Sequence, residues 1–403
     1  MAGGNGAERV RRMAAGETTK RSELDAASLV GRLRARAAAE LADEEEVWAV
    51  VDMSELGKPH AREMQDLMRV RKLGGEGTVP GDRTLNVLGV GRGGRRGVLH
   101  HRLFSAEEAA FASESREIRD ALAATGAALS AQAGAVTYLM DSQFDDVAVW
   151  AGVWGQENHL ACRLKHADRL VEHPDGAGGW RTGHLQEAAG RARELARART
   201  ELLVRQRGQR RAKRQPTTAA VAACPVRVRY RADARTAHPG PERTKDAWLG
   251  VVRLENVDAD PWLLLTDRPV ADEAGALRAF RMDRMRWSIE DAFTFTKDVV
   301  GWEDAQLMQL EAVRTLVALG WVAAGFLSHL GVTLEWPEIR LLARLGGWEP
   351  RKDRPPGKTI LSRGLQRLLD RWATDAILAD EIRRHGRLPP RLTALLGPHA
   401  TAT

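Results

Sequence analysis

Residues 47–52 read Val-Trp-Ala-Val-Val-Asp, a continuous apolar run that ends on a carboxylate. An apolar run of this length without polar alternation is typical of a strand that is buried on both faces. The pattern returns at residues 136–141, which read Val-Thr-Tyr-Leu-Met-Asp. We therefore predict two central strands, each of which places an acid, Asp52 or Asp141, at its carboxyl end.

The segments between these two runs predict the rest of a core. Strands are expected near 84–90 and 97–104, with residues 91–96 as the hairpin turn between them. Residues 105–124 predict a helix with Ser105 as its N-cap. Three strands, a helix and a fourth strand, with acids after the first and fourth strands, follow in the order of the ribonuclease-H-like fold. This order favours an enzyme of phosphoryl transfer.

The chain changes character after the second acid. The stretch 191–214 holds ten Lys and Arg residues and is predicted to be helical, as a solvated helix or a DNA clamp. Short strands are expected at 226–230 and 248–254. The core resumes at the apolar run 262–266, and helices are predicted from Ala274 onward. The fold class is α/β, with a mixed sheet, a β-containing insertion between Asp141 and Glu290, and a helical C-terminal region.

Five segments follow from this reading of the chain. They are an N-terminal helical segment 1–46, with an amphipathic helix over 22–42, which is interpreted as a truncated DNA-binding region; the first part of the catalytic core, 47–160; the insertion, 161–260; the second part of the core, 261–330; and the helical C-terminal region, 331–403.

Composition limits the class of partner and the compartment. The 61 Lys and Arg residues exceed the 54 Asp and Glu residues, and the net charge of +7 suits a polyanion. Cys162 and Cys224 form no Cys-x-x-Cys motif, so neither a disulfide framework nor a zinc site is expected. The apolar stretch 315–327 is shorter than the roughly 20 residues of a bilayer span, so it predicts a buried helix. We expect a cytoplasmic protein without a signal peptide or a membrane partner.

The stretch 280–297 holds the most informative spacing in the chain. At about 100° per residue, one helix face would carry Asp283, Arg286, Glu290 and Lys297. A carboxylate on such a face can ligate a divalent cation while the cationic side chains contact DNA phosphates. The alternative is an ordinary solvated face, since charge pairs four residues apart are common on helices.

This stretch resembles the DDE transposases of the insertion-sequence-four family. Their signature is Tyr, two residues, Arg, three residues, Glu, six residues, Lys; Arg286, Glu290 and Lys297 match it, whereas Asp283 stands in the Tyr position. Further segments resemble the family in the same order, and they are 50–59, 140–145, 262–270 and 346–368. The resemblance covers the chain from about 47 to 370.

The resemblance implies a site and its ligands. It gives Asp52, Asp141 and Glu290 as catalytic residues that hold two Mg²⁺ ions, for which Mn²⁺ is expected to substitute. Asp145 and Asp146 remain rivals to Asp141. The residues expected at the DNA are Lys58, Trp262, Arg286 and Lys297. Trp262 would stack on a flipped base, and the alternative is a core Trp on a buried strand.

The function implied is that of a bacterial, nucleoid-associated transposase. It would cut double-stranded DNA at the terminal inverted repeats and join the ends to target DNA, acting as a homodimer on paired ends. One alternative is an impaired or truncated copy that binds ends or dimerises as an inhibitor; another is a nuclease of the same fold. The inhibitor is favoured by the 51 residues before Asp52, which are few for an end-binding domain, and by Asp283, which is expected to face phosphate and to pair with Arg286.

Overall fold

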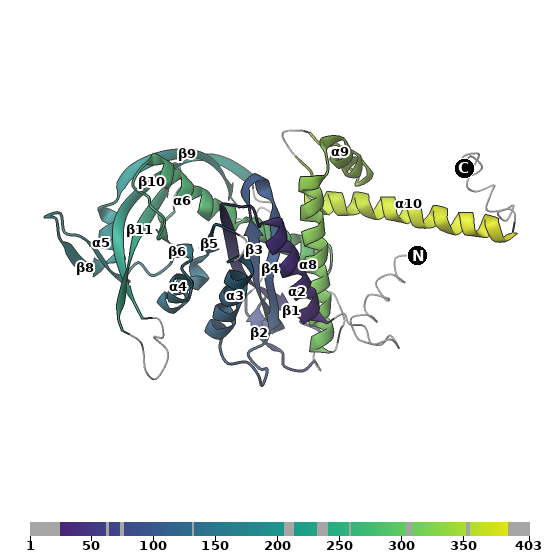
Figure 1. The fold of residues 1–403 in the computed structure, drawn as a ribbon, viewed down its shortest axis with the longest axis horizontal. Coiled ribbons are helices and arrows are strands. Elements are labelled where there is room, and N and C mark those ends of the chain that lie inside the picture. Colours follow the sequence, from purple (N-terminus) through teal and green to yellow (C-terminus); the bar gives the residue numbers. More distant parts are fainter. Residues whose placement is uncertain are drawn as a thin grey trace. The chain divides into compact units, whose positions relative to one another are not determined.

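The fold was analysed in a computed structural model, which describes residues 25–61, 64–72, 76–130, 133–204, 213–231, 241–257, 259–303, 307, 309–351 and 355–385. Within these ranges the protein is α/β, with a mixed sheet of mostly antiparallel strands and a helical C-terminal region (Figure 1). The described residues form one 12-stranded sheet in which the main strand order is β2-β3-β1-β5-β6-β12-β11-β10-β7-β8.

Three strands build the antiparallel part of the core. They are β1 (Glu46–Gly57), β3 (Thr78–Val90) and β4 (Arg96–Phe104), and the short strand β2 (Met68–Arg71) pairs with β3. The predicted hairpin turn is confirmed, since Val90 pairs with Arg96 across the short helix η1 (Arg92–Gly94). Gly93 and Gly94 have φ angles of 74° and 85°, which favour glycine in this turn.

The second predicted central strand is also confirmed. Strand β5 (Ala135–Met140) pairs with β1 in parallel, and β6 (His159–Leu164) pairs with β5 in parallel. Strands β1 and β5 are apolar before their acids because helices cover both faces of this part of the sheet. Val51 and Met140 belong to the core on one face, whereas Leu139 lines a cavity against helix α6 (Glu273–Arg286) on the other.

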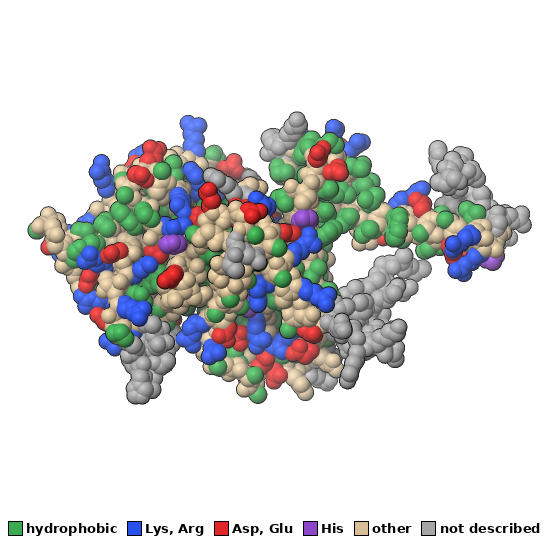
Figure 2. Space-filling view, in the orientation of Figure 1, with side chains coloured by type: hydrophobic (Ala, Val, Ile, Leu, Met, Phe, Trp, Pro, Cys, Tyr) green, Lys and Arg blue, Asp and Glu red, His purple; other side chains and the backbone are tan. Residues whose placement is uncertain are grey.

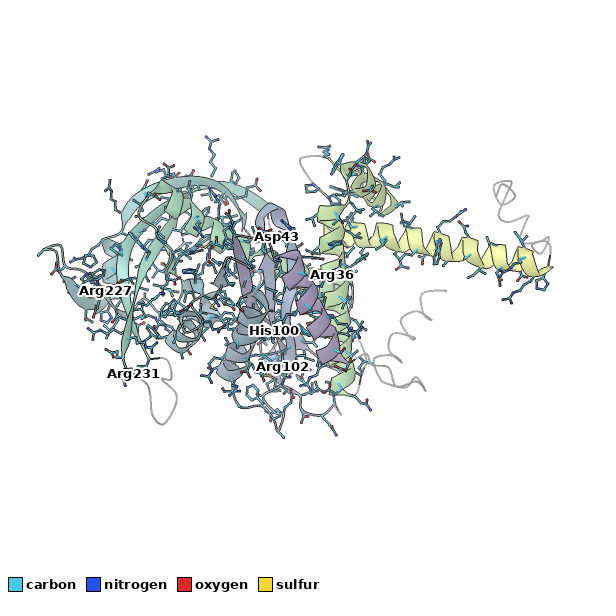
Figure 3. All side chains as sticks on the ribbon, viewed as in Figure 1. Arg36, Asp43, His100, Arg102, Arg227 and Arg231 are labelled. Atoms are coloured by element: carbon cyan, nitrogen blue, oxygen red, sulfur yellow. The ribbon has the colours of Figure 1, made fainter. Side chains whose placement is uncertain are left out.

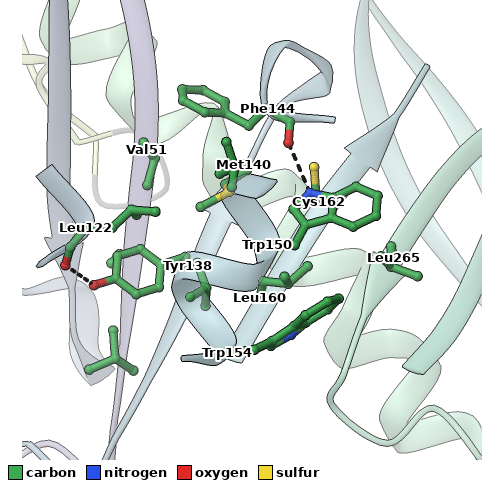
Figure 4. Packing of buried hydrophobic residues seen from close by; sticks show 14 of the residues in the cluster. Val51, Leu122, Tyr138, Met140, Phe144, Trp150, Trp154, Leu160, Cys162 and Leu265 are labelled. Carbon is green, nitrogen blue, oxygen red and sulfur yellow. Dashed lines mark hydrogen bonds between the residues drawn. The ribbon is translucent and has the colours of Figure 1, made fainter. Parts of the chain in front are cut away.

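The core on the first face packs around large side chains from several elements. The Tyr138 hydroxyl donates to the Leu122 carbonyl at 3.0 Å, and the Trp150 indole nitrogen donates to the Phe144 carbonyl at 3.0 Å (Figure 4). The first bond joins β5 to helix α3 (Glu114–Leu129), and the second joins helix α4 (Val147–Trp154) to the short helix η2 (Ser142–Phe144). These bonds support the turn that follows Asp141.

The helix expected over 105–124 begins later than predicted. Helix α3 starts after Ser113, whose hydroxyl accepts from the Arg116 amide at 3.1 Å. Ser105 instead accepts from the Glu107 amide at 3.2 Å in a turn. The turn is stabilised because Phe111 stacks on Phe104, with 5.8 Å between the ring centroids. Two serines therefore compete as N-caps, and packing selects Ser113 as the cap of the helix.

The insertion contributes strands to the same sheet. They are β7 (Leu170–Pro174), β8 (Trp180–His184), β9 (Arg193–Val204), β10 (Lys213–Tyr230) and β11 (Arg243–Leu254), with the short helix α5 (Leu185–Gly190) between β8 and β9. Strand β12 (Trp262–Thr266) has the predicted bounds and pairs with β6 and β11. The short strands expected at 226–230 and 248–254 lie within β10 and β11. Two long strands of the insertion, β9 and β10, arch over α6 (Figure 1).

The helix predicted over 191–214 is wrong where the structure describes that stretch. Residues 193–204 form strand β9, paired along its length with β10, and residues 205–212 lie outside the described part. Ala196 is buried and Arg197 is exposed, and exposure continues to alternate through Arg199 and Thr200. This period of two is that of a strand, and the high Arg content concealed it.

The remaining helices carry the C-terminal region. They are α7 (Ser288–Asp298), α8 (Leu310–Thr333), α9 (Trp336–Leu345) and α10 (Lys358–His385). The N-terminal helix α2 (Ala26–Glu40) starts at the Asp25 cap, and residues 22–24 of its predicted range lie outside the described part. The chain divides into two compact units, Met1–Gly325 and Phe326–Thr403.

Helix α8 is long and apolar enough, by length and composition, to cross a membrane. Its Val317 and Trp321 are buried within the first unit, and Trp321 packs against Trp302 with 6.0 Å between the ring centroids. The prediction of a buried helix over 315–327 is confirmed for these residues.

Candidate catalytic carboxylate site

Two parallel strands bring Asp52 and Asp141 side by side. Val51 pairs with Met140, so the residue that follows each of them, Asp52 or Asp141, occupies the next position along its strand. Because alternate residues of a strand share a face, Asp141 lies on the side of Leu139, which faces α6. The two carboxylates therefore project from one edge of the sheet toward one face.

A third charged residue extends this row. Met140 also pairs with Cys162 of β6, and Arg163 follows Cys162. Arg163 was not anticipated from the sequence, because strand β6 was not predicted. The signal that could have revealed it is the alternation of apolar Leu160, Cys162 and Leu164 with more exposed neighbours. We call Asp52, Asp141 and Arg163 the strand-end row.

Glu290 reaches the same row from helix α7. The pKa of Asp52 is raised to about 7, first by burial and then by the charges of Asp141 and Glu290, while Arg286 opposes the rise. Burial likewise raises the pKa of Glu290, with Arg286 opposing and Asp141 adding to the shift. The three predicted acids thus interact with one another, although their segments are far apart in the chain.

The rivals of Asp141 have other partners. Asp145 is buried and accepts bonds from the amides of Lys165 and His166, at 2.8 and 2.9 Å, as well as an ion pair from Arg169. Asp146 caps helix α4 by accepting from the Ala148 amide at 2.8 Å. Asp141 accepts from the Gln143 amide at 2.8 Å, and it alone of the three occupies the strand-end row. The geometry therefore favours Asp141 as the second acid.

The donor groups at this site are of the kind that can hold a divalent cation. Among the residues that the structure describes, no group of three His, Cys, Asp or Glu side chains is arranged closely enough to hold a metal ion. The donors themselves are hard carboxylate oxygens, the type that Mg²⁺ prefers. Burial first, and then repulsion from the neighbouring acids, raises the pKa of Asp52, and a bound cation would relieve this charge imbalance. The donor chemistry fits Mg²⁺, and closing the site would require the carboxylates to move together.

The helix face predicted over 280–297 is divided. Helix α6 ends at Arg286 and α7 begins at Ser288, with Trp287 between them. The Glu290 amide donates to the Trp287 carbonyl at 3.2 Å, a tighter spacing than that of an α-helix. The single continuous helix is therefore wrong, although the Arg286 guanidinium still lies 3.9 Å from the Glu290 carboxylate.

Two lysines expected at DNA have partners inside the protein. Lys58 is buried, and its ammonium group donates to the carbonyls of Trp302 and, at 3.4 Å, Glu303. Lys297 donates to the Glu55 carbonyl at 2.8 Å and lies 4.0 Å from the Glu303 carboxylate. Lys58 thus joins the end of β1 to the segment around Glu303, and Lys297 joins α7 to β1 and to Glu303. Neither lysine presents its charge on an open surface.

Asp283 does not occupy the place expected for it. It is 6% exposed, and its carboxylate accepts from the Arg163 guanidinium at 3.0 Å. The expectation that Asp283 faces phosphate and pairs with Arg286 is therefore wrong. The physical reason is that α6 turns the face that carries Asp283 toward β5, β6 and β12.

Trp262 occupies an intermediate position. It is the first residue of β12 and is partly buried, and the Arg163 guanidinium lies 4.1 Å from the centre of its ring. One face of the indole is thus covered by a cation. Trp262 is neither a fully enclosed core residue nor a free stacking platform.

Basic residues of the insertion are largely paired where the structure describes them. Arg227 bonds Asp246 at 2.8 Å and stacks on Trp180 at 4.0 Å, and Arg231 lies 3.9 Å from Glu242. Both arginines lie well away from His100 and Arg102 of β4 (Figure 3). Four arginines expected to form a DNA clamp fall outside the described residues, and they are Arg205, Arg207, Arg210 and Arg211. On the face shown in Figure 2, basic and acidic side chains are interspersed.

Comparison with known proteins adds no assignment to this geometry. A scan against protein-family models and a search of curated proteins both found no match to the chain.

Proposed function

We propose that this chain is a DNA transposase, which cuts phosphodiester bonds at transposon ends and joins the ends to target DNA by two-metal-ion phosphoryl transfer. The observation that carries the proposal is the convergence of Asp52, Asp141 and Glu290. Two of these acids end adjacent parallel strands, and the third interacts with both from α7. Three carboxylates from separate segments are the ligands that a pair of Mg²⁺ ions requires.

The strand order supports a ribonuclease-H-like core for this enzyme. The order β4-β3-β1-β5-β6 contains an antiparallel group of three strands, followed by two strands parallel to β1, with α3 between β4 and β5 in the chain. This is the order expected of the fold once the short edge strand β2 is set aside. Strands β7 to β11 then form the insertion between the second acid and Glu290.

Each acid has a proposed role toward the ions. Asp52 would be shared by both cations, whereas Asp141 and Glu290 would hold one each. When bound, the two cations would activate the attacking water or 3′-hydroxyl and stabilise the leaving oxygen. The buried position of Asp52 favours the central role, since it is 8% exposed and interacts with both other acids.

Arg286 is the proposed contact to the DNA backbone, which requires DNA to approach a side chain that is 8% exposed in the DNA-free protein. Its guanidinium lies beside Glu290, and its charge opposes the rise in the pKa of both Asp52 and Glu290. A cation in that position can neutralise part of the charge of an incoming phosphate. The further partners in this proposal are the terminal inverted repeats, the target DNA and a second copy of the chain.

Mg²⁺-dependent cleavage of the DNA that flanks the gene, resolved on a gel, tests the proposal. The full chain should cut at the ends of the element, and inverted repeats with a short target duplication should mark those ends. The variants Asp52→Asn, Asp141→Asn and Glu290→Gln should lose cleavage at least about 100-fold while they keep DNA binding. The matched control is Asp146→Asn, which alters a helix cap next to the site and should still cut.

The outcomes separate the candidate functions. Cleavage by Asp141→Asn at the parental rate would remove Asp141 from the site. A parental chain that binds the ends but never cuts them would favour the inhibitor instead.

A further inference from the structure

A buried cluster of charged side chains adjoins the strand-end row. Arg163, Asp283 and Arg286 line one small, water-sized cavity between strands β5, β6 and β12 and helix α6. Asp283 and Arg286 are each 6% exposed, and the side chain of Arg163 is 20% exposed. Charges buried this deeply are costly unless each is paired, so the partner that each one takes has consequences for the site.

Arg163 is held from two sides. One of its terminal nitrogens donates to Asp283 at 3.0 Å, and its guanidinium plane lies over the Trp262 ring at 4.1 Å. The carboxylate gives the guanidinium a charged hydrogen-bond acceptor, and the indole adds a cation–π contact. Together they direct Arg163 toward α6 and β12.

Arg163 also has a competing partner. Asp141 stands beside it in the strand-end row. Burial lowers the pKa of Arg163, and the charges of Asp283 and Asp141 both oppose that lowering. A long, flexible arginine between two carboxylates can pair with either one. A pair with Asp141 would occupy the carboxylate oxygens that a divalent cation needs.

We infer that Asp283 is a positioning residue, which keeps the Arg163 guanidinium on Trp262 and away from Asp141, and so leaves the Asp141 carboxylate open to a divalent cation. This inference rests on the proposed function, because it assigns Asp141 to a metal site. It gives a role to Asp283, which stands where the signature of the insertion-sequence-four family has Tyr.

Binding of Mn²⁺ alone to the full-length chain, without DNA, tests this role. The concentration of free Mn²⁺ is followed by electron paramagnetic resonance. Asp283→Asn frees Arg163 to pair with Asp141, so the Mn²⁺ affinity should fall about tenfold, which corresponds to about 1.4 kcal/mol. Arg163→Met removes the competing cation and should not weaken binding. The double variant Arg163→Met/Asp283→Asn should recover the affinity to within about threefold of the parent.

Two further comparisons distinguish positioning from a general loss of structure or charge. A purely structural role for Asp283 would leave the double variant as weak as Asp283→Asn. A simple charge effect would instead make Arg163→Met bind Mn²⁺ about tenfold more tightly than the parent, whereas positioning leaves its affinity near that of the parent. The matched control is Glu46→Gln, which breaks the ion pairs of Glu46 with Arg268 and Arg278 at the other end of β1. It should lower the melting temperature without changing the Mn²⁺ affinity.

Each result has a defined reading. If the parent binds Mn²⁺ and Asp283→Asn binds it equally well, the inference alone is overturned. The same holds if the double variant does not recover the affinity of the parent. A parent without saturable Mn²⁺ binding overturns the proposed metal site together with the inference. If Asp283→Asn does not fold, the apolar pair Arg163→Met/Asp283→Met replaces it. Weaker Mn²⁺ binding by this pair, or by Arg163→Met, would contradict the role.

Discussion

At the residue scale, the buried acids of the candidate site lower the stability of the folded protein. Asp52 is 8% exposed and lies among other acids, so its charge is opposed by both burial and repulsion. Asp82 of β3 is fully buried, and neither of its carboxylate oxygens has a hydrogen-bond partner among the described residues. Both buried acids therefore destabilise the folded protein when they are ionised. Asp52 lies at the proposed site and Asp82 lies outside it, so their effects on stability can be compared directly.

The first prediction concerns Asp52. Its pKa in the folded protein is about 7, above the usual value of 3.8 for an aspartate, so the folded state holds the proton more tightly than the unfolded state. Stability is therefore lost as the pH rises from about 4 to 7, and it stays lost above that range. Asp52→Asn should stabilise the metal-free protein at pH 8 by roughly 2 kcal/mol, and much less at pH 4. Urea unfolding in EDTA at both pH values measures this difference; an equal effect at both would contradict it.

The second prediction uses Asp82 as a buried acid outside the site. Its pKa is raised to about 7 by burial first and by Glu108 next, with Arg314 and Lys58 opposing. The sign is the same as for Asp52, so Asp82→Asn should also gain roughly 2 kcal/mol at pH 8 and little at pH 4. The two variants should differ in function, since Asp82→Asn should keep DNA cleavage. Loss of cleavage in a well-folded Asp82→Asn protein would show that this acid also serves the site.

At the element scale, strand β9 is the part of the insertion that adjoins the signature helices. Arg284 of α6 donates to the Glu201 carbonyl of β9 at 3.1 Å, so β9 runs beside the helix that ends at Arg286. The exposed face of β9 carries Arg197 and Arg199. Arg197 is paired with both Glu194 and Glu255, at 2.7 Å each. The two arginines therefore present the same side chain on the same strand with different electrostatic surroundings.

The third prediction compares these two arginines. If β9 contacts DNA phosphate, Arg199→Ala should weaken binding of all DNA sequences and reduce the slope of log K against log salt by about 1. Arg197→Ala should change the slope less, because its charge is already offset by two acids. Fluorescence anisotropy with a labelled duplex over a series of salt concentrations measures both slopes. Identical slopes for Arg199→Ala and the parent would mean that this strand faces solvent.

At the scale of the whole molecule, net charge explains little and the arrangement of charges explains more. The chain carries a net charge of +7, yet acidic side chains are interspersed with basic ones on the face shown in Figure 2. The three acids proposed for catalysis, Asp52, Asp141 and Glu290, instead interact with one another within the first compact unit. Cation binding at that place should therefore affect the stability of the unit as a whole.

The fourth prediction follows from this coupling. A ligand that binds only the folded state stabilises it by about 2.7 kcal/mol at a hundred times its dissociation constant. Saturating Mg²⁺ should raise the melting temperature of the parent, and the gain should disappear in Asp141→Asn. The same concentration of Na⁺ at matched ionic strength is the control. An equal rise in melting temperature for the parent and for Asp141→Asn would assign the effect to general screening of surface charge.

The sequence by itself determined the elements whose pattern is local. The apolar runs before Asp52 and Asp141 predicted β1 and β5, and the run at 262–266 predicted β12 with its observed bounds. These predictions succeeded because a strand buried on both faces needs apolar residues at every position, whatever its neighbours are. The spacing of Arg286 and Glu290 also led to two side chains that lie together in the structure.

Only the tertiary structure decided which side chains meet. It moved the start of α3 to Ser113, divided the signature helix at Trp287 and made β9 a strand. It also enclosed Lys58 and paired Asp283 with Arg163, a residue 120 positions away in the chain. The physical reason is that a charged side chain takes its partner from whichever segment packs against it. Strand register and helix packing set that choice, and neither leaves a periodic signal in the sequence.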